Sequence, residues 1–124
     1  MLEKGVAAQS RTTVCEANTA AAMGSGDMPV FATPAMVALM ENAAMLAVAP
    51  GLPEGAATVG AEMNVSHIKP SGLGAEIVAS AVVTAVEGRK ITFNVGARDA
   101  DGMIGEGTHV RFIVDRERFL AKLK

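Results

Sequence analysis

One stretch of the sequence decides the fold: Thr33-Pro-Ala-Met-Val-Ala-Leu-Met-Glu-Asn-Ala-Ala-Met-Leu-Ala-Val48. Thr33 and Pro34 predict a helix start, because threonine can cap free N–H groups and proline is tolerated at the first helical position. Pro50-Gly51 predicts the helix end. The apolar residues fall on every side of this helix, which is typical of a helix enclosed by the rest of the protein. The sequence therefore predicts one buried central helix.

Runs of strand composition surround this helix in the sequence. Four long runs follow it and one short run precedes it: Thr58–Ile68, Glu76–Glu87, Lys90–Asp99, Met103–Asp115 and, before the helix, Arg11–Glu16. Short turns separate the four long runs, and short loops favour antiparallel neighbours. Asn18–Pro29 is predicted to be a mobile loop, and Arg116–Lys124 a short amphipathic helix. The whole pattern predicts an α+β fold, with a long antiparallel sheet around one helix.

Length and composition limit the possible classes of protein. The 124 residues suffice for one core and not for two, so we expect residues 1–124 to form a single domain. A net charge of −2 and a pI near 5.6 lack the basic excess that nucleic acid binding needs. The single Cys15 cannot form an internal disulfide, and Met1–Gln9 lacks the apolar run of a secretion signal. We therefore expect a cytoplasmic protein that does not bind nucleic acid.

Membrane and metal partners are also not expected. The apolar segment Ala35–Ala49 is interrupted by Glu41 and Asn42 and is shorter than the roughly 20 residues of a membrane span. The two histidines and the one cysteine stand at no metal-ligand spacing. The sequence thus predicts neither a membrane anchor nor a metal site.

Glu41 is the most informative candidate for chemistry. Its helical neighbours three and four positions away are all apolar: Val37, Ala38, Ala44 and Met45. A carboxylate in apolar surroundings is costly to ionise and has a raised pKa, which suits a general base or a nucleophile near neutral pH. The alternative is a glutamate that reaches solvent at the helix edge. Because Asn42 is its only polar neighbour on the helix, we favour a functional Glu41.

His67 and Thr33 are the other two candidates. Strand alternation places His67 on the same apolar face as Val59, Ala61, Met63 and Val65. An imidazole there can exchange a proton near neutral pH, although such a histidine is more often structural. Thr33 is explained by helix capping alone, and about 12 Å of helical rise separates it from Glu41. A bound substrate or a partner subunit would have to bring their roles together.

Several segments together resemble the fluoroacetyl-CoA thioesterase-like branch of the hot-dog superfamily: Val30–Ala44, Thr58–Gly60 with Val65–His67, and Ile104–His109. The resemblance implies a hot-dog fold that hydrolyses an acyl-CoA thioester, with Thr33, Glu41 and His67 as the catalytic set. It implies that the backbone of Gly60 faces the substrate and that Arg111 lies near the acyl-CoA. It also implies a homodimer with the active site at the subunit interface, and no metal or redox cofactor.

The chemistry that the resemblance implies has two routes. Glu41 either attacks the thioester carbonyl or activates a water that does so, while His67 acts as acid and base and Thr33 polarises the substrate. Arg111 shares the side of its strand with His109 and could meet a CoA phosphate, or it could be a solvated surface arginine. The glycines Gly105 and Gly107 indicate either a bulge or a close approach of another group to this strand, which packing or a ligand passing over the strand could each explain.

The sequence departs from the fluoroacetyl-selective members of that family at the substrate end. Those members carry aromatic residues in the lid before the helix and beside the glutamate, whereas Asn18–Pro29 has no aromatic residue and Asn42 follows Glu41. We therefore expect another short- or medium-chain acyl-CoA as substrate. The alternatives are a non-catalytic acyl-CoA-binding module, a dehydratase or hydratase of 3-hydroxyacyl thioesters, and a purely structural dimer. A dehydratase has no use for Thr33, which favours hydrolysis.

Overall fold

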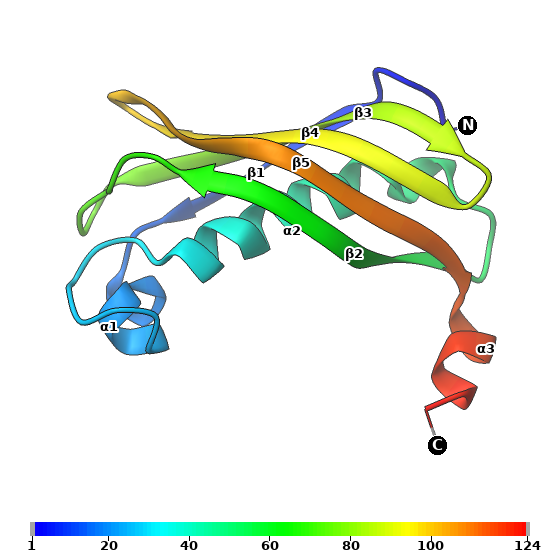
Figure 1. Cartoon of the computed structure of the whole chain (residues 1–124), viewed down its shortest axis with the longest axis horizontal. Coiled ribbons are helices and arrows are strands. Elements are labelled where there is room, and N and C mark those ends of the chain that lie inside the picture. Colours follow the sequence, from blue (N-terminus) through cyan, green and yellow to red (C-terminus); the bar gives the residue numbers. More distant parts are fainter. Residues whose placement is uncertain (1, 124) are drawn as a thin grey trace.

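One curled antiparallel sheet holds a single long helix in the computed structural model, which describes residues 2–123 (Figure 1). The strand order is β1-β3-β4-β5-β2. The strands are β1 (Ala7–Thr13), β2 (Ala56–His67), β3 (Glu76–Glu87), β4 (Lys90–Asp99) and β5 (Gly102–Asp115). The long helix is α2 (Thr33–Val48), which the short 3₁₀ turn Ala49–Gly51 ends. The predicted sheet wrapped around a central helix is confirmed.

The core lies between α2 and the strands β1, β3 and β4. The helix buries small and flexible side chains there: Met36, Met40, Ala43, Ala44, Ala47 and Val48. The predicted close approach to Gly105 is confirmed, because a Cβ there would lie 2.6 Å from the Met36 sulfur. By length and composition alone, Thr33–Gly51 would also pass for a membrane-spanning helix. Only part of that apolar composition is explained by packing in the core, because Met45 and Leu46 are 41% and 45% exposed. The prediction that the rest of the protein encloses the helix on every side is therefore wrong for the single chain.

The N-terminal segments differ from the sequence prediction. The first strand runs over Ala7–Thr13 and not over Arg11–Glu16, because pairing with β3 fixes it from Ala7 opposite Val82 to Thr13 opposite Glu76. The predicted loop contains the short helix α1 (Ala20–Met23), which Thr19 caps. Gly24, with φ +78°, ends this helix. The segment before α2 is therefore more ordered than its composition suggests.

The C-terminal helix α3 (Arg116–Ala121) projects from the end of β5 (Figure 1). Asp115 caps it by accepting a hydrogen bond from the Arg118 backbone N–H at 3.0 Å. The predicted helix extends further, to Lys124, which lies outside the described residues.

Strand β2 contains a β-bulge that the sequence analysis missed. Its register against β5 shifts between Gly60 and Glu62, so that Ala61 is the extra residue. Beyond the bulge, Met63 and Val65 pack against the core as predicted. Before it the alternation is reversed, and Gly60 faces the helix. The prediction that Val59 and Ala61 share the face of His67 is therefore wrong.

Candidate active site

Thr33 and His67 meet at the start of α2. The Oγ1 atom of Thr33 lies 2.8 Å from Nδ1 of His67, which is the last residue of β2. The N-cap of α2 is Ala32, and no side chain caps the helix there. The capping role predicted for Thr33 is therefore wrong: Thr33 is the first helical residue, and its hydroxyl group bonds to the imidazole.

The imidazole of His67 is half-buried beside a cavity. Burial lowers the pKa of His67 below its usual value of 6.5, so the ring is largely neutral at neutral pH. Within the described residues, Nε2 of His67 is buried and has no hydrogen-bond partner. Thr33 and His67 line a cavity of about 250 Å³, together with residues from the segment before α2 and the turn after β2, among them Ala20, Ser25 and Pro70. His67 thus brings a neutral imidazole to the wall of this cavity.

Glu41 lies two turns further along α2, on the side that faces β2 and β5. Its side chain is 42 % exposed, and its Oε2 lies 3.6 Å from Nη1 of Arg111. The carboxylate also lies directly over Gly60, where a Cβ atom would collide with it. The prediction of apolar surroundings for Glu41 is therefore wrong. Its helical neighbours are apolar, but the strands across from it present a guanidinium group and a glycine.

Arg111 is 7 % exposed and is held from three directions. Its Nε donates to Thr58 Oγ1 at 2.9 Å and its Nη2 to the Thr58 carbonyl at 3.0 Å. Its Nη1 lies 3.2 Å from Nε2 of His109, and His109 Nδ1 lies 2.8 Å from the Glu62 carbonyl. The predicted common side of His109 and Arg111 is confirmed. The sequence analysis missed Thr58 and His109 as parts of this cluster, although the alternation of β5 gave the signal for His109.

One chain therefore contains two separate groups of candidate residues. The first is the Thr33–His67 pair, and the second consists of Glu41, Gly60 and Arg111 with its supports. Within residues 2–123 of the single chain, Glu41 makes no hydrogen bond to Thr33 or His67. Each group joins one residue of α2 to one residue of β2: Thr33 to His67 in the first, and Glu41 to Gly60 in the second. The geometry supplies a carboxylate, an imidazole and a hydroxyl for acid–base chemistry on a small substrate.

The sequence matches a family of thioesterases. The family model described as fluoroacetyl-CoA-specific thioesterase matches residues 14–117. A fluoroacetyl-CoA thioesterase from Streptantibioticus cattleyicolor is 39% identical over 95 residues, which cover 77% of this chain and 68% of that protein.

Solved structures agree with this match. A threonine-to-serine variant of the fluoroacetyl-CoA enzyme in complex with acetyl-CoA has a TM-score of 0.93 and 30% sequence identity, covering 98% of this chain and 96% of that chain. A thioesterase superfamily member from Thermus thermophilus has a TM-score of 0.91 and 26% identity, with 99% and 91% covered. This chain belongs to the fluoroacetyl-CoA-specific thioesterase family and is a thioester hydrolase with the hot-dog fold.

Proposed function

We propose that this chain hydrolyses the thioester of a short- or medium-chain acyl-CoA, and that Thr33, Glu41 and His67 carry the reaction. The observation that carries the proposal is the Thr33–His67 pair at 2.8 Å, beside a cavity of about 250 Å³. The Nε2 atom of His67 is buried and has no hydrogen-bond partner among the described residues, which supports a role for this atom beyond packing. The relative solved with acetyl-CoA supports an acyl-CoA ligand.

The chemistry converts the thioester and one water into a carboxylic acid and the free thiol of CoA. In one route Glu41 removes a proton from the water that attacks the carbonyl carbon, and in the other its own oxygen attacks and water then hydrolyses the resulting anhydride. The C–S bond breaks in either route, and the leaving sulfur needs a proton. The neutral His67 must first accept this proton before it gives it to the sulfur: in the first route it is the proton that Glu41 removed from water, and in the second it comes from solvent and is returned there when water hydrolyses the anhydride. The Thr33 hydroxyl is placed to polarise the carbonyl oxygen or to relay this proton.

We assign supporting roles to Gly60 and Arg111 within the same reaction. Arg111 is buried and directed at Glu41, so we expect it to act at the acyl end of the substrate and not at the exposed phosphates of CoA. Gly60 leaves the space that the Glu41 carboxylate occupies. Neither residue transfers a proton in this proposal.

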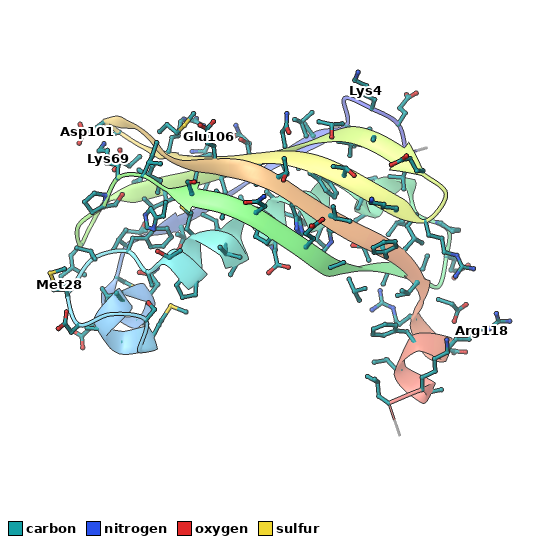
Figure 2. All side chains as sticks on the ribbon, in the orientation of Figure 1. Lys4, Met28, Lys69, Asp101, Glu106 and Arg118 are labelled. Atoms are coloured by element: carbon teal, nitrogen blue, oxygen red, sulfur yellow. The ribbon has the colours of Figure 1, made fainter. Side chains whose placement is uncertain are left out.

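The acyl group is not expected to be fluoroacetyl in preference to others. The segment Asn18–Pro29 has no aromatic residue, and Met28 in it is 60% exposed and directed outwards (Figure 2). Asn42 next to Glu41 is drawn towards β1, because its Oδ1 accepts a hydrogen bond from Ser10 Oγ at 2.6 Å. Neither Met28 nor Asn42 is therefore placed to close over a two-carbon acyl group. We expect the kcat/KM values for acetyl-CoA and fluoroacetyl-CoA to differ by less than about tenfold.

Release of free thiol from a panel of acyl-CoAs tests the activity. The panel runs from acetyl-CoA and fluoroacetyl-CoA to medium-chain acyl groups. Glu41→Gln and His67→Ala are each expected to lower kcat by about 10²- to 10⁴-fold, the usual size of an acid–base contribution. Binding of acyl-CoA by the wild type without thiol release from any substrate would replace the hydrolase by a binding module.

We also propose a cytoplasmic, single-domain protein that forms a homodimer with its active sites at the interface. Strand β2 is an edge of the sheet, and an unpaired edge can add a strand from another chain. In a two-fold pair of β2 strands centred on Met63 and Asn64, Gly60 would stand opposite His67 of the partner subunit. Such a pair would join the Glu41 group of one chain to the Thr33–His67 pair of the other.

Mixing two inactive variants tests this dimer. If Glu41 and His67 act across the interface, a dimer of one Glu41→Gln chain and one His67→Ala chain keeps one intact site. Random exchange of equal amounts then restores about a quarter of the wild-type activity. If both residues act within one chain, every site carries one substitution and no activity returns. Size-exclusion chromatography with light scattering gives the mass, and a clean monomer would contradict the dimer.

A further inference from the structure

His109 is an almost completely buried polar side chain to which the proposed reaction gives no role. It is 1% exposed, and its ring stacks on Phe93 of β4 with the ring centres 5.7 Å apart. A buried imidazole must satisfy both of its nitrogens, and here two specific atoms do so. Nδ1 lies 2.8 Å from the Glu62 carbonyl, and Nε2 lies 3.2 Å from Nη1 of Arg111.

These two neighbours determine which nitrogen carries the proton. A carbonyl oxygen can only accept, so Nδ1 of His109 must carry a hydrogen and donate it to the Glu62 carbonyl. A guanidinium can only donate, so Nε2 must be unprotonated and accept from Arg111. Burial lowers the pKa of His109, and the positive charge of Arg111 adds to this effect. The ring is therefore a neutral acceptor with one fixed tautomer.

The Arg111 guanidinium depends on this acceptor for the nitrogen that faces Glu41. Thr58 holds Nε and Nη2 of Arg111, and neither bond reaches Nη1. Nη1 is the atom 3.6 Å from Glu41 Oε2, and its hydrogen bond within the described residues is to His109. Because the Glu41 side chain is half-exposed, its position depends on the ion pair with Nη1 of Arg111.

We propose that His109 is a positioning residue for the hydrolysis. As a neutral Nδ1–H imidazole anchored on the Glu62 carbonyl, it fixes Arg111 Nη1, which in turn holds the Glu41 carboxylate over Gly60. This rests on the proposed function, since it requires Glu41 to take part in hydrolysis. His109 itself is only 1% exposed, so in this proposal it acts through Arg111 and not on the substrate.

The groups packed against His109 also predict a response to acid. Arg111 of β5 and Glu41 of α2 are the charged groups near the ring, β4 contributes the uncharged Phe93, and β2 contributes the Glu62 carbonyl. A second proton on Nε2 would leave two donors facing each other, His109 and Arg111, both positively charged. The hydrogen bond would then be lost, and the Glu41 carboxylate would lose its fixed partner.

Variants at His109 separate this role from packing. His109→Phe keeps an aromatic ring but has no donor or acceptor, whereas His109→Gln keeps one of each. Phe93→Leu is the matched control, because it removes the ring stack and leaves the hydrogen bonds. We expect His109→Phe to lower kcat by about 10- to 100-fold, the usual effect of removing a hydrogen-bond partner behind a catalytic group. KM should change by less than about threefold, because His109 does not touch substrate.

His109→Gln should recover most of that loss. If protonation of His109 lowers the kcat of the wild type at acid pH, this decrease should be absent in His109→Gln, because glutamine does not titrate. Phe93→Leu should keep kcat within about threefold of the wild type. Equal losses in His109→Phe and Phe93→Leu, or no recovery in His109→Gln, would overturn the proposal and leave a packing role.

A double-mutant cycle tests the route through Arg111. In an Arg111→Lys background, the change His109→Phe should cost little further activity, because both substitutions break the same connection. If His109→Phe lowers kcat by the same factor in the Arg111→Lys background as in the wild type, the proposal is overturned.

Nitrogen NMR of the wild-type imidazoles tests the tautomer independently of activity. The chain has two histidines, so His67→Ala leaves the His109 signals alone. A proton on Nδ1 of His109 at neutral pH supports the proposal, and a proton on Nε2 overturns it. If the wild type hydrolyses no acyl-CoA, the proposed function fails, and the positioning role fails with it even where the tautomer is as expected.

Discussion

The substitution Gly60→Ala tests whether activity depends on the position of the Glu41 carboxylate, and it should do so with little effect on the stability of the fold. A Cβ at residue 60 would collide with Glu41 Oε2 and would lie 3.4 Å from Arg111 Nη1. The backbone of Gly60 does not have a positive φ, so alanine fits the strand without strain. The added methyl group therefore acts mainly on the carboxylate above it.

The cost to stability is expected to be small. The colliding atom is the end of a flexible side chain that is 42% exposed, so the carboxylate can shift without leaving Arg111, and weakening this ion pair should cost at most about 1 kcal/mol. Replacing glycine with alanine where the backbone allows it stabilises by about 0.4–1 kcal/mol. The two effects oppose each other, so the net change should stay within about 1 kcal/mol, or about 4 °C in Tm.

The cost to activity is expected to be much larger. A catalytic group displaced by about 1 Å can lose about 10² in rate, so we expect kcat to fall about 100-fold. Thiol release gives kcat and KM, and calorimetry gives Tm for the same preparations. Gly96→Ala on β4 is the matched control, because a Cβ there meets only Gly105 O and Ser80 Oγ, both at 3.8 Å. If Gly60→Ala keeps kcat within about threefold of Gly96→Ala, the carboxylate does not act from above Gly60.

Three further outcomes follow from the contacts. Thr33→Val should lower kcat about 10- to 100-fold by removing the hydroxyl bonded to His67, whereas Thr33→Ser should keep most activity in the same thiol assay. Burial lowers the pKa of His67 and His109, so stability should be complete above about pH 6.5 and fall below it, as the unfolded chain binds protons that the folded chain does not. Urea midpoints that do not drop between about pH 7.5 and about pH 5.5 would contradict this. Asp99→Asn should cost about 1–3 kcal/mol of unfolding free energy, because the buried carboxylate accepts from Lys69 Nζ at 3.1 Å; an unchanged Tm would refute that role.

The sequence predicts the main architecture because local residues mark the ends of the helix and of the long strands. Pro34 and Pro50-Gly51 bound the helix, and glycine-containing turns separate the long strands. The first strand was misplaced because Ala7–Ser10 has no β-branched residue to mark it. Pairing with β3, a contact between distant parts of the chain, makes it a strand.

The candidate site was only partly predictable for a related reason. Periodicity describes the neighbours of Glu41 on its own helix but not the strands across from it, so Arg111 beside the carboxylate was not foreseen. The hydrogen bond from Thr33 to His67 joins the start of a helix to the end of a strand, and only the curl of the sheet brings those ends together. An isolated glycine in a strand often marks a bulge, so Gly60 gave a usable signal.

The β-bulge at Ala61 explains how one edge strand serves both groups of candidate residues. Positions 60 and 67 differ by an odd number, so a regular strand would turn Gly60 and His67 to opposite faces. The extra residue reverses the alternation between them, and both then face α2. The Glu62 carbonyl, directly after the bulge, accepts the hydrogen bond that orients His109. The space for the Glu41 carboxylate, the support of Arg111 and the direction of the His67 imidazole therefore all depend on a single inserted residue.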